Sequence, residues 1–135
     1  MIKGIAHVAF NVTDMSKSLQ FYCDVLGFQK VFEIRDDHGN PWIEYIKIRQ
    51  GQFIELFYAK EALSRGNAPG LTYSHLCLEV DDIHAIADRL RAKGLTLDVE
   101  PKQGKDGNYQ CWVRDPDDNR IEFMQMDPNS LQSKS

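Results

Sequence analysis

Hydrophobic and polar residues follow the same order of patterns in two successive blocks of the chain. Each block opens with an apolar or alternating run of strand length, at residues 5–12 and 73–80. An amphipathic helical stripe comes next in each block. Three more strand-like runs complete the blocks: 28–34, 42–48 and 53–58 in the first, and 95–99, 109–113 and 120–126 in the second. The pattern predicts an α+β fold built from two tandem βαβββ modules.

Residues typical of helix ends flank both helical stripes. The stripes are formed by Met15, Leu19, Tyr22, Val25 and Leu26 in the first block and by Ile83, Ile86, Ala87 and Leu90 in the second. Asp14 and Asp82 precede them, where a carboxylate oxygen accepts hydrogen bonds from otherwise unpaired backbone N–H groups. Gly27 and Gly94 follow them, where a left-handed residue commonly ends a helix. We therefore expect each helix to begin after its aspartate and to end at its glycine.

The two blocks are also similar in sequence. His7 corresponds to His75, 68 positions later, and Glu55 corresponds to Glu122, 67 positions later. Landmarks in the same order at nearly the same shift indicate an internal repeat. The segment between the blocks contains the Gly and Pro residues of a loop. We expect a single domain, residues 1–135, with module one at about 2–59, a linker at 60–72, module two at about 73–126 and a polar tail at 127–135.

Strand alternation places the repeated histidines and glutamates on one face of each sheet. If Val8 and its apolar neighbours point toward the helix, His7 points to the opposite face. The same reasoning puts His75, Glu55 and Glu122 on the faces away from the helices. Candidates for lining a pocket on these faces are Asn11, Phe53, Phe57 and Met124. Ordinary core packing explains the apolar members of this set equally well.

Two imidazoles and two carboxylates form a donor set for a divalent cation. If the two sheets curl around a shared concavity, His7, Glu55, His75 and Glu122 converge in it. Such ligands suit Zn²⁺, Ni²⁺, Co²⁺, Fe²⁺ and Mn²⁺, and affinity alone does not choose among these metals. Four protein ligands would leave positions for water or substrate. The alternative is that each histidine is a hydrogen-bonded core residue and each glutamate faces solvent at a sheet edge.

Composition limits the classes of partner. A chain of 135 residues with 42% hydrophobic content is long enough for one domain with its own core. The net charge of −4 offers no basic surface for nucleic acid, and no apolar run approaches membrane-helix length. The first residues lack the features of a signal peptide. Three distant cysteines argue against a disulfide framework and are consistent with a reducing cytoplasm. We therefore expect a cytoplasmic protein without nucleic-acid or membrane partners.

Four stretches of the sequence resemble one known family. They are "HVAFNVTDMSKSLQFYCDVLGF", "IELF", "SHLCLEVDDI" and "DPDDNRIEF". With them the chain is similar to the glyoxalase/bleomycin-resistance superfamily, also called vicinal oxygen chelate proteins. The ordered set of His, Glu, His and Glu resembles the glyoxalase I-like branch, lactoylglutathione lyase. The resemblance spans residues 2–126.

The resemblance implies an architecture and a metal site. Paired βαβββ modules of this superfamily form an open, U-shaped barrel with the helices outside, commonly as a homodimer. In glyoxalase I the metal lies at the subunit interface. Carried over to this chain, the ligands are His7, Glu55, His75 and Glu122. The resemblance favours one Ni²⁺ or Co²⁺ per site, and Zn²⁺ is possible.

The resemblance also implies a reaction on a small-molecule substrate. The hemithioacetal of an α-oxoaldehyde, such as methylglyoxal, and a thiol would be converted to a 2-hydroxy thioester through a metal-stabilised enediolate. Glu122 would take and return the proton as the base. Glu55 would serve as the base for the other enantiomer of the substrate, or it would remain a metal ligand.

One departure from the family pattern concerns the thiol. Glyoxalase I enzymes that bind glutathione typically carry an Arg four residues after the first His and an Asn four residues after the first Glu. Here these positions hold Asn11 and Ala59, and cationic contacts from Lys102 or Lys105 are an alternative. The thiol could therefore differ from glutathione. Two other functions are alternatives: an epimerase or isomerase acting beside a carbonyl, and a non-catalytic drug- or metabolite-binding module.

Overall fold

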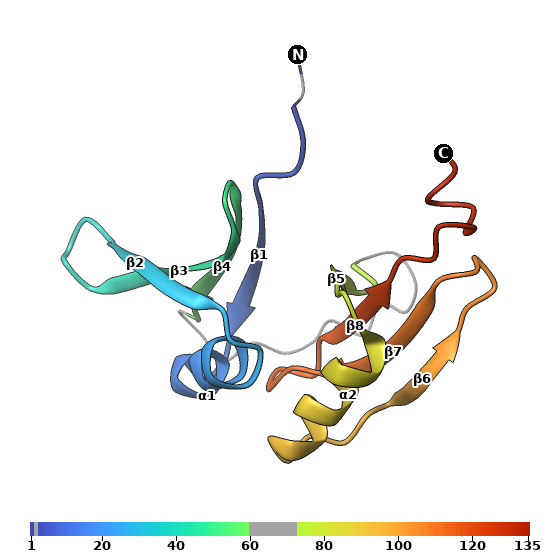
Figure 1. Ribbon diagram of the computed structural model, residues 1–135. Helices are drawn as coiled ribbons and strands as arrows, with labels where there is room; N and C mark the ends of the chain where they lie inside the picture. The colour runs from blue at the N-terminus through green and yellow to red at the C-terminus, as the bar shows by residue number, and fades with distance from the viewer. Residues whose placement is uncertain (2, 60–72) are drawn as a thin grey trace. The chain divides into compact units, whose positions relative to one another are not determined.

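The structure is a computed structural model of the chain, and it describes residue 1, residues 3–59 and residues 73–135. The predicted linker, 60–72, lies outside the described residues. The chain divides into two compact units, Met1–Asn67 and Ala68–Ser135. Each unit contains one four-stranded sheet and one helical segment (Figure 1).

The first unit follows the predicted order of elements. Its elements are β1 (His7–Val12), α1 (Met15–Leu19), the π-helix η1 (Gln20–Val25), β2 (Gln29–Arg35), β3 (Pro41–Arg49) and β4 (Gln52–Tyr58). The strands lie in the order β1-β4-β3-β2. β1 runs parallel to β4, and the other neighbours are antiparallel.

The second unit repeats this topology. Its elements are β5 (Leu76–Glu79), α2 (Ile83–Ala92), β6 (Val99–Gln103), β7 (Tyr109–Arg114) and β8 (Arg120–Gln125). The strand order is β5-β8-β7-β6, with β5 parallel to β8 and α2 packed against β6, β7 and β8. The predicted α+β fold with two tandem βαβββ modules is confirmed.

The predicted helix ends are confirmed as well. Asp14 accepts a hydrogen bond from the backbone N–H of Lys17 at 3.1 Å. Asp82 accepts two, from the backbone N–H groups of residues 84 and 85, at 2.8 and 3.0 Å. Gly27 and Gly94 both have φ of 84°, a conformation that costs glycine little and other residues much more.

The second half of the first helix differs from the prediction, because it is a π-helix. The N–H of Leu26 reaches back five residues to the carbonyl of Phe21, at 3.0 Å. The wider turn buries the consecutive residues Phe21 and Tyr22, whose rings meet edge-on at 5.0 Å. Leu19 and Val25, which the predicted stripe includes, are only half-buried.

Three strands begin at least two residues later than the sequence pattern predicts. β1 begins at His7, and β5 begins at Leu76, so His75 lies immediately before its strand. The run 95–99 is mostly not a strand, and β6 follows it. The cause is the end of α2, where the N–H of Leu95 returns to the carbonyl of Leu90 at 3.0 Å. The chain therefore reaches the sheet only at Asp98, whose N–H binds the carbonyl of Trp112.

The two sheets bury apolar residues on their helix-facing sides. In β1, Phe10 and Val12 are buried while His7 and Asn11 are exposed, which confirms the predicted alternation. The core residues facing the helices are Phe10, Val12, Ile46, Ile54 and Leu56 in the first unit and Leu78, Cys111, Val113, Ile121 and Phe123 in the second. The faces that carry the repeated histidines and glutamates are thus left on the opposite sides.

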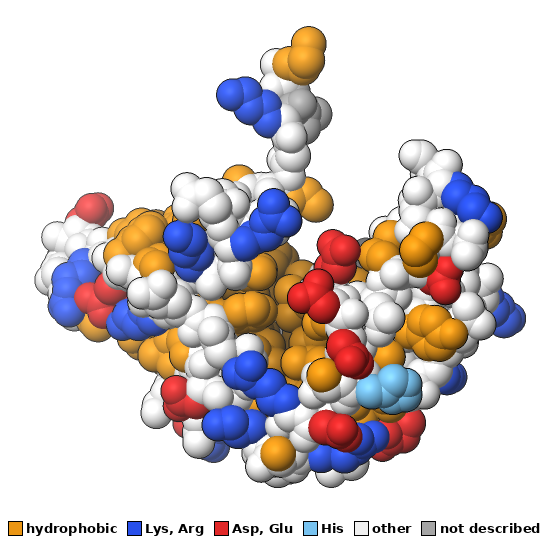
Figure 2. All heavy atoms as spheres, viewed as in Figure 1, with side chains coloured by type: hydrophobic (Ala, Val, Ile, Leu, Met, Phe, Trp, Pro, Cys, Tyr) orange, Lys and Arg blue, Asp and Glu red, His pale blue; other side chains and the backbone are white. Residues whose placement is uncertain are grey.

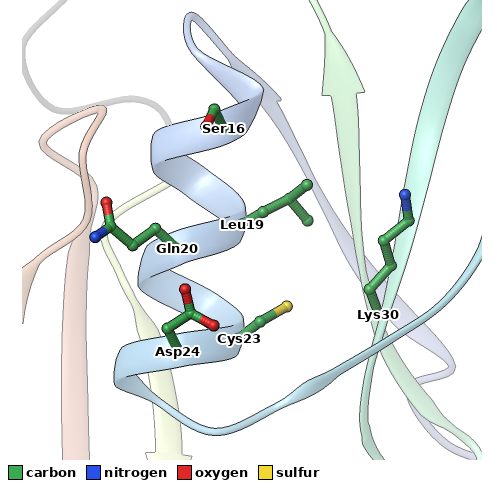
Figure 3. Close-up of a pocket in the computed structure, with 6 residues that line it drawn as sticks. All are labelled: Ser16, Leu19, Gln20, Cys23, Asp24 and Lys30. Carbon is green, nitrogen blue, oxygen red and sulfur yellow. The ribbon is translucent and has the colours of Figure 1, made fainter.

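A charged cluster lies on the helix-facing side of the first unit. Glu44 is only 1% exposed, and its carboxylate lies 2.7 Å from Lys30 Nζ and accepts a hydrogen bond from the Tyr58 hydroxyl at 2.8 Å. Lys30 also lines a shallow pocket beside α1 and η1. Figure 3 shows Leu19 and Cys23 pointing from the helix toward the strand that carries Lys30. Burial raises the pKa of the Cys23 thiol, so it stays protonated at neutral pH.

The predicted polar tail, 127–135, packs on the second unit. The N–H of Asp127 binds the side-chain oxygen of Asn108 at 3.0 Å, and the N–H of Leu131 binds the carbonyl of Asp106 at 3.2 Å. Ser130 is buried by this arrangement. The turn that joins β6 to β7 is thereby fixed by residues beyond the last strand.

The surface is mixed in charge. Figure 2 shows Lys and Arg side chains scattered among Asp and Glu side chains over the visible face. Within the described part of the chain, none of the helices has both the length and the apolar character needed to cross a membrane.

Candidate functional site

The first unit brings His7 and Glu55 together on the face of its sheet opposite the helix. In the parallel pairing of β1 with β4, Ala9 lies beside Glu55 and His7 lies beside Phe53. His7 is therefore diagonal to Glu55, and its Nδ1 atom lies 3.3 Å from Glu55 Oε1. Glu55 is 5% exposed, whereas the His7 side chain is half-exposed.

The second unit forms the corresponding pair. His75 Nε2 lies 3.1 Å from Glu122 Oε2, and the other ring nitrogen, Nδ1, lies 3.0 Å from the hydroxyl of Ser74. Glu122 is 6% exposed. In the pairing of β5 with β8, Cys77 lies beside Glu122, in the place that Ala9 occupies beside Glu55. The predicted pairing of one His with one Glu thus has the same layout in both units.

The two carboxylates have different hydrogen-bond donors. Tyr45 pairs with Glu55 across β3 and β4, and the hydrogen bond from its hydroxyl to this carboxylate raises the pKa of Tyr45. Cys77 occupies the other flank of Glu122. Desolvation first, and then the negative charge and hydrogen bonding of Glu122, raise the pKa of the Cys77 thiol to about 12. At neutral pH both neighbours are therefore protonated donors.

Neither carboxylate is neutralised by a Lys or Arg side chain of the described residues. Among the described residues, Glu55 and Glu122 have histidine as their only ion-pair partner, without a Lys or Arg. An ionised carboxylate buried without a compensating charge is expensive. Imidazole nitrogens and carboxylate oxygens are suitable ligands for divalent transition metals, so the donor set fits such a cation.

The rest of the face in the first unit is aromatic. Phe53 pairs with His7, and Phe57 pairs with Asn11, so these predicted pocket residues do share the face with Glu55. Tyr45 stacks on Phe32 with ring centroids 4.2 Å apart and meets Phe53 at 6.2 Å. All of these aromatic side chains are partly or well exposed.

The corresponding face in the second unit carries charged and polar side chains as well as an aromatic ring. Trp112 pairs with Glu122 across β7 and β8 and is the counterpart of Tyr45. Its ring contacts the His75 ring edge-on, with the ring centroids 4.7 Å apart. The guanidinium carbon of Arg120 lies over the Trp112 ring, 4.3 Å from its centroid. Its indole N–H donates to Gln110 at 2.6 Å. Met124, a predicted pocket residue, is half-buried on this face.

The structure therefore brings the four predicted ligands together as two pairs, one within each unit. In the described part of the chain, no group of three or more His, Cys, Asp or Glu side chains is close enough to hold a metal ion. Cys77, beside Glu122, is exposed. Lys102 and Lys105, the alternative cationic contacts, are both exposed.

Sequence reasoning missed three side chains of these faces: Tyr45, Trp112 and Arg120. The signal for Tyr45 and Trp112 was present, because they are separated by the same 67 positions as Glu55 and Glu122. Arg120 lies two residues before Glu122 on β8, so alternation alone places it on the same face.

Comparison with known proteins decides the family. The sequence profile of the Glyoxalase/Bleomycin resistance protein/Dioxygenase superfamily matches residues 4–123. The chain belongs to this superfamily. A probable lactoylglutathione lyase of Synechocystis sp. is 32% identical over 90% of this chain and 94% of its own length. Another from Vibrio cholerae is 33% identical over 90% of this chain and 89% of its own length.

A solved structure supports the assignment of this chain to the glyoxalase superfamily. The crystal structure of the glyoxalase family protein from Enterococcus faecalis matches with a TM-score of 0.77 and 25% identity. The match covers 90% of this chain and 97% of that chain. The resemblance to the superfamily and to its glyoxalase I-like branch is thereby confirmed.

Proposed function

We propose that this protein is a metal-dependent lyase of the glyoxalase I type. Its substrate is the hemithioacetal formed from an α-oxoaldehyde, such as methylglyoxal, and a thiol. Its product is the isomeric 2-hydroxy thioester. The similarity to proteins named lactoylglutathione lyase supports this reaction class.

The observation that carries the proposal is that both units bury a glutamate without a Lys or Arg partner among the described residues. Each unit holds a glutamate that is about one-twentieth exposed, with an imidazole as its only ion-pair partner among the described residues. A divalent cation would supply the missing positive charge. A structural salt bridge or a solvent-facing glutamate would require neither the burial nor the repetition of the arrangement.

The proposed ligands are His7, Glu55, His75 and Glu122. One module supplies two of them and another module supplies the other two, either within one chain or between the chains of a homodimer. Ni²⁺ and Co²⁺ are the favoured metals, with Zn²⁺ possible. When bound, the cation would stabilise the negative charge that develops on the substrate oxygens during proton transfer.

Glu122 is the proposed base. It removes the proton from the substrate carbon that bears the sulfur and the hydroxyl group, and it returns this proton to the adjacent carbonyl carbon, while the hydroxyl proton passes to the former carbonyl oxygen. The substrate and the product are therefore isomers. A general base of this kind contributes typically about 10²–10⁴-fold to rate. Glu55, which has the Tyr45 hydroxyl as its neighbour, is proposed to remain a ligand.

The pocket residues have supporting roles in this scheme. Phe53 and Phe57 flank Glu55 along β4 and present apolar rings on its face. Such rings exclude water from a developing charge and pack against the carbon atoms of a substrate. Met124 lies beside Glu122 in the same way, and Asn11 provides an amide opposite Phe57.

A panel assay tests the proposal. Apo-protein is refilled separately with Ni²⁺, Co²⁺, Zn²⁺ and Mn²⁺, and each form is assayed with methylglyoxal hemithioacetals of several thiols. We expect turnover with at least one metal, its loss on chelation, and its return on refilling. Absence of turnover with every metal and thiol contradicts the proposal. Metal-independent binding of a small molecule without turnover would instead assign the chain to the binding proteins of the superfamily.

A further inference from the structure

We propose that Arg120 is a specificity-determining residue that binds a carboxylate of the substrate beside Glu122. The inference rests on the proposed function, because it places the reacting carbon at Glu122.

Arg120 is correctly placed for this role. It lies two residues before Glu122 on β8, so both side chains project from the same face about 6.6 Å apart along the strand. His75 immediately precedes Leu76, which pairs with Ile121, so His75 lies level with Arg120. A substrate that reacts at Glu122 therefore has Arg120 as a neighbour along the strand.

The guanidinium is held in position by an aromatic ring. It lies 4.3 Å from the centre of the Trp112 ring, within the range of a cation–π interaction. Trp112 is itself fixed by its hydrogen bond to Gln110 and by its contact with His75. Stacking of this kind leaves the N–H groups at the edge of the guanidinium directed outward, where a carboxylate can bind two of them.

Arg120 lacks an acidic partner within the described residues, whereas its neighbour is fully paired. Arg114 lies directly opposite Arg120 across β7 and β8. Arg114 binds Asp98 at 2.6 Å and Asp118 at 2.9 Å. No ion pair joins Arg120 to a carboxylate in residues 3–59 and 73–135. Like charges opposite each other in a sheet are unfavourable, and an anion at Arg120 would relieve that cost.

The first unit shows that the position does not require a cation for folding. The counterpart of Arg120, 67 positions earlier, is Phe53, which pairs with His7 on β1 and with Lys47 on β3. The same sheet position next to a histidine therefore accepts an aromatic ring. Because only the second unit carries arginine there, a substrate with a carboxylate would bind in one orientation.

The carboxylate belongs either to the thiol or to the α-oxoaldehyde, and paired substrates distinguish the two. Methylglyoxal is combined with 3-mercaptopropionate or with 3-mercaptopropionamide, which differ in charge at the same shape. A carboxylated α-oxoaldehyde and its amide are each combined with 2-mercaptoethanol. We expect kcat/KM to favour one carboxylate over its amide by about tenfold to a hundredfold, as for a hydrogen bond to a charged group.

Variants connect that preference to Arg120. Arg120→Met should remove the preference for the carboxylate, so that the acid and the amide turn over at similar rates. Arg120→Lys should keep part of it, since a lysine supplies charge without the planar fork. Arg49→Met, at the exposed end of β3, is the matched control and should behave as the wild type. Equal rates for acid and amide in the wild type, or a preference that survives in Arg120→Met, overturns the proposal.

A binding measurement separates this proposal from the proposed reaction. The indole N–H signal of Trp112 is followed by NMR while 3-(methylthio)propionate or its amide is added to metal-free protein. We expect the acid to shift the signal and the amide not to, with no shift by the acid in Arg120→Met. Identical responses to acid and amide contradict carboxylate binding. A specific shift without turnover of any hemithioacetal would retain Arg120 as an anion site and reject the lyase.

Discussion

The two units differ most on the faces that carry their glutamates. Both faces are centred on a buried glutamate with a histidine diagonal to it. Around that shared centre, the first unit places Phe53 and Tyr45, whereas the second places Arg120 and Trp112. The repeat therefore keeps the proposed metal ligands and varies their surroundings. One face suits apolar parts of a substrate, and the other suits its charged parts.

The helix-facing sides differ in a second way. In the first unit, Leu56 of β4 pairs with Glu44, which is buried and contacts the partly exposed Lys30 and the Tyr58 hydroxyl. In the second unit, the corresponding strand position is Cys111, which is fully buried. The same place in the fold thus accepts either an ion pair or a small apolar side chain. The buried ion pair is a property of the first unit and not a requirement of the βαβββ module.

Glu122 and Glu55 offer the largest expected contrast between the units. We expect Glu122→Gln to lower kcat by about 10²–10⁴-fold, because an amide cannot act as the base. Glu55→Gln should chiefly weaken metal binding, so excess metal should restore part of its activity. Steady-state kinetics over a range of metal concentrations checks both. Near-normal turnover by Glu122→Gln, with circular dichroism unchanged, removes the base assignment.

The ion pair beneath the first unit predicts a smaller effect, on stability. Lys30→Met leaves the Glu44 carboxylate buried with the Tyr58 hydroxyl as its remaining partner. Breaking a fully buried pair costs about 3–5 kcal/mol, and because Lys30 is 42% exposed we expect about 1–2 kcal/mol. Urea unfolding measures the difference. Lys47→Met, on the opposite face of the same sheet, is the control, and an equal loss in both variants would argue against a specific role of the pair.

The smallest expected effect concerns the reactivity of two cysteine thiols on opposite faces of the second sheet. The pKa values of Cys77 and Cys111 are raised to about 12 and about 11, so both are protonated at pH 8 and should alkylate slowly in metal-free protein. The rate at Cys77 should keep rising beyond pH 9, where an ordinary thiol levels off. Glu122→Gln removes a nearby negative charge and should lower the pKa of Cys77 more than that of Cys111, for which the charge of Glu122 is the smallest cause. Mass spectrometry of alkylated peptides follows each site, and equal acceleration at both would indicate general loosening.

The sequence predicts the parts of the molecule that recur. His7 and Glu55 have counterparts at nearly constant offset, and alternation places them on the correct face without knowledge of the fold. The π-helix and the late start of β6 were not predicted. They depend on where a helix turn widens or closes, as at Leu26 and Leu95, and periodicity alone does not determine this.

Tyr45 and Trp112 show that periodicity is also insufficient to predict the neighbours of the proposed ligands. Each is opposite its glutamate only because of the register between neighbouring strands, β3 with β4 and β7 with β8, and the β3/β4 register shifts between Lys47 and Arg49. A strand pattern gives the face of a side chain, but it does not give the partner across the sheet.

Metal binding by paired histidine variants tests the central claim most directly. Wild-type protein, His7→Ala and His75→Ala are each dialysed against Ni²⁺, and bound metal is measured by mass spectrometry. His38→Ala and His84→Ala serve as controls. If both modules supply ligands to a common cation, the wild type and the controls bind about one ion per chain, and either site variant loses affinity by about tenfold or more. Full metal occupancy in both site variants, at wild-type affinity, would contradict the account.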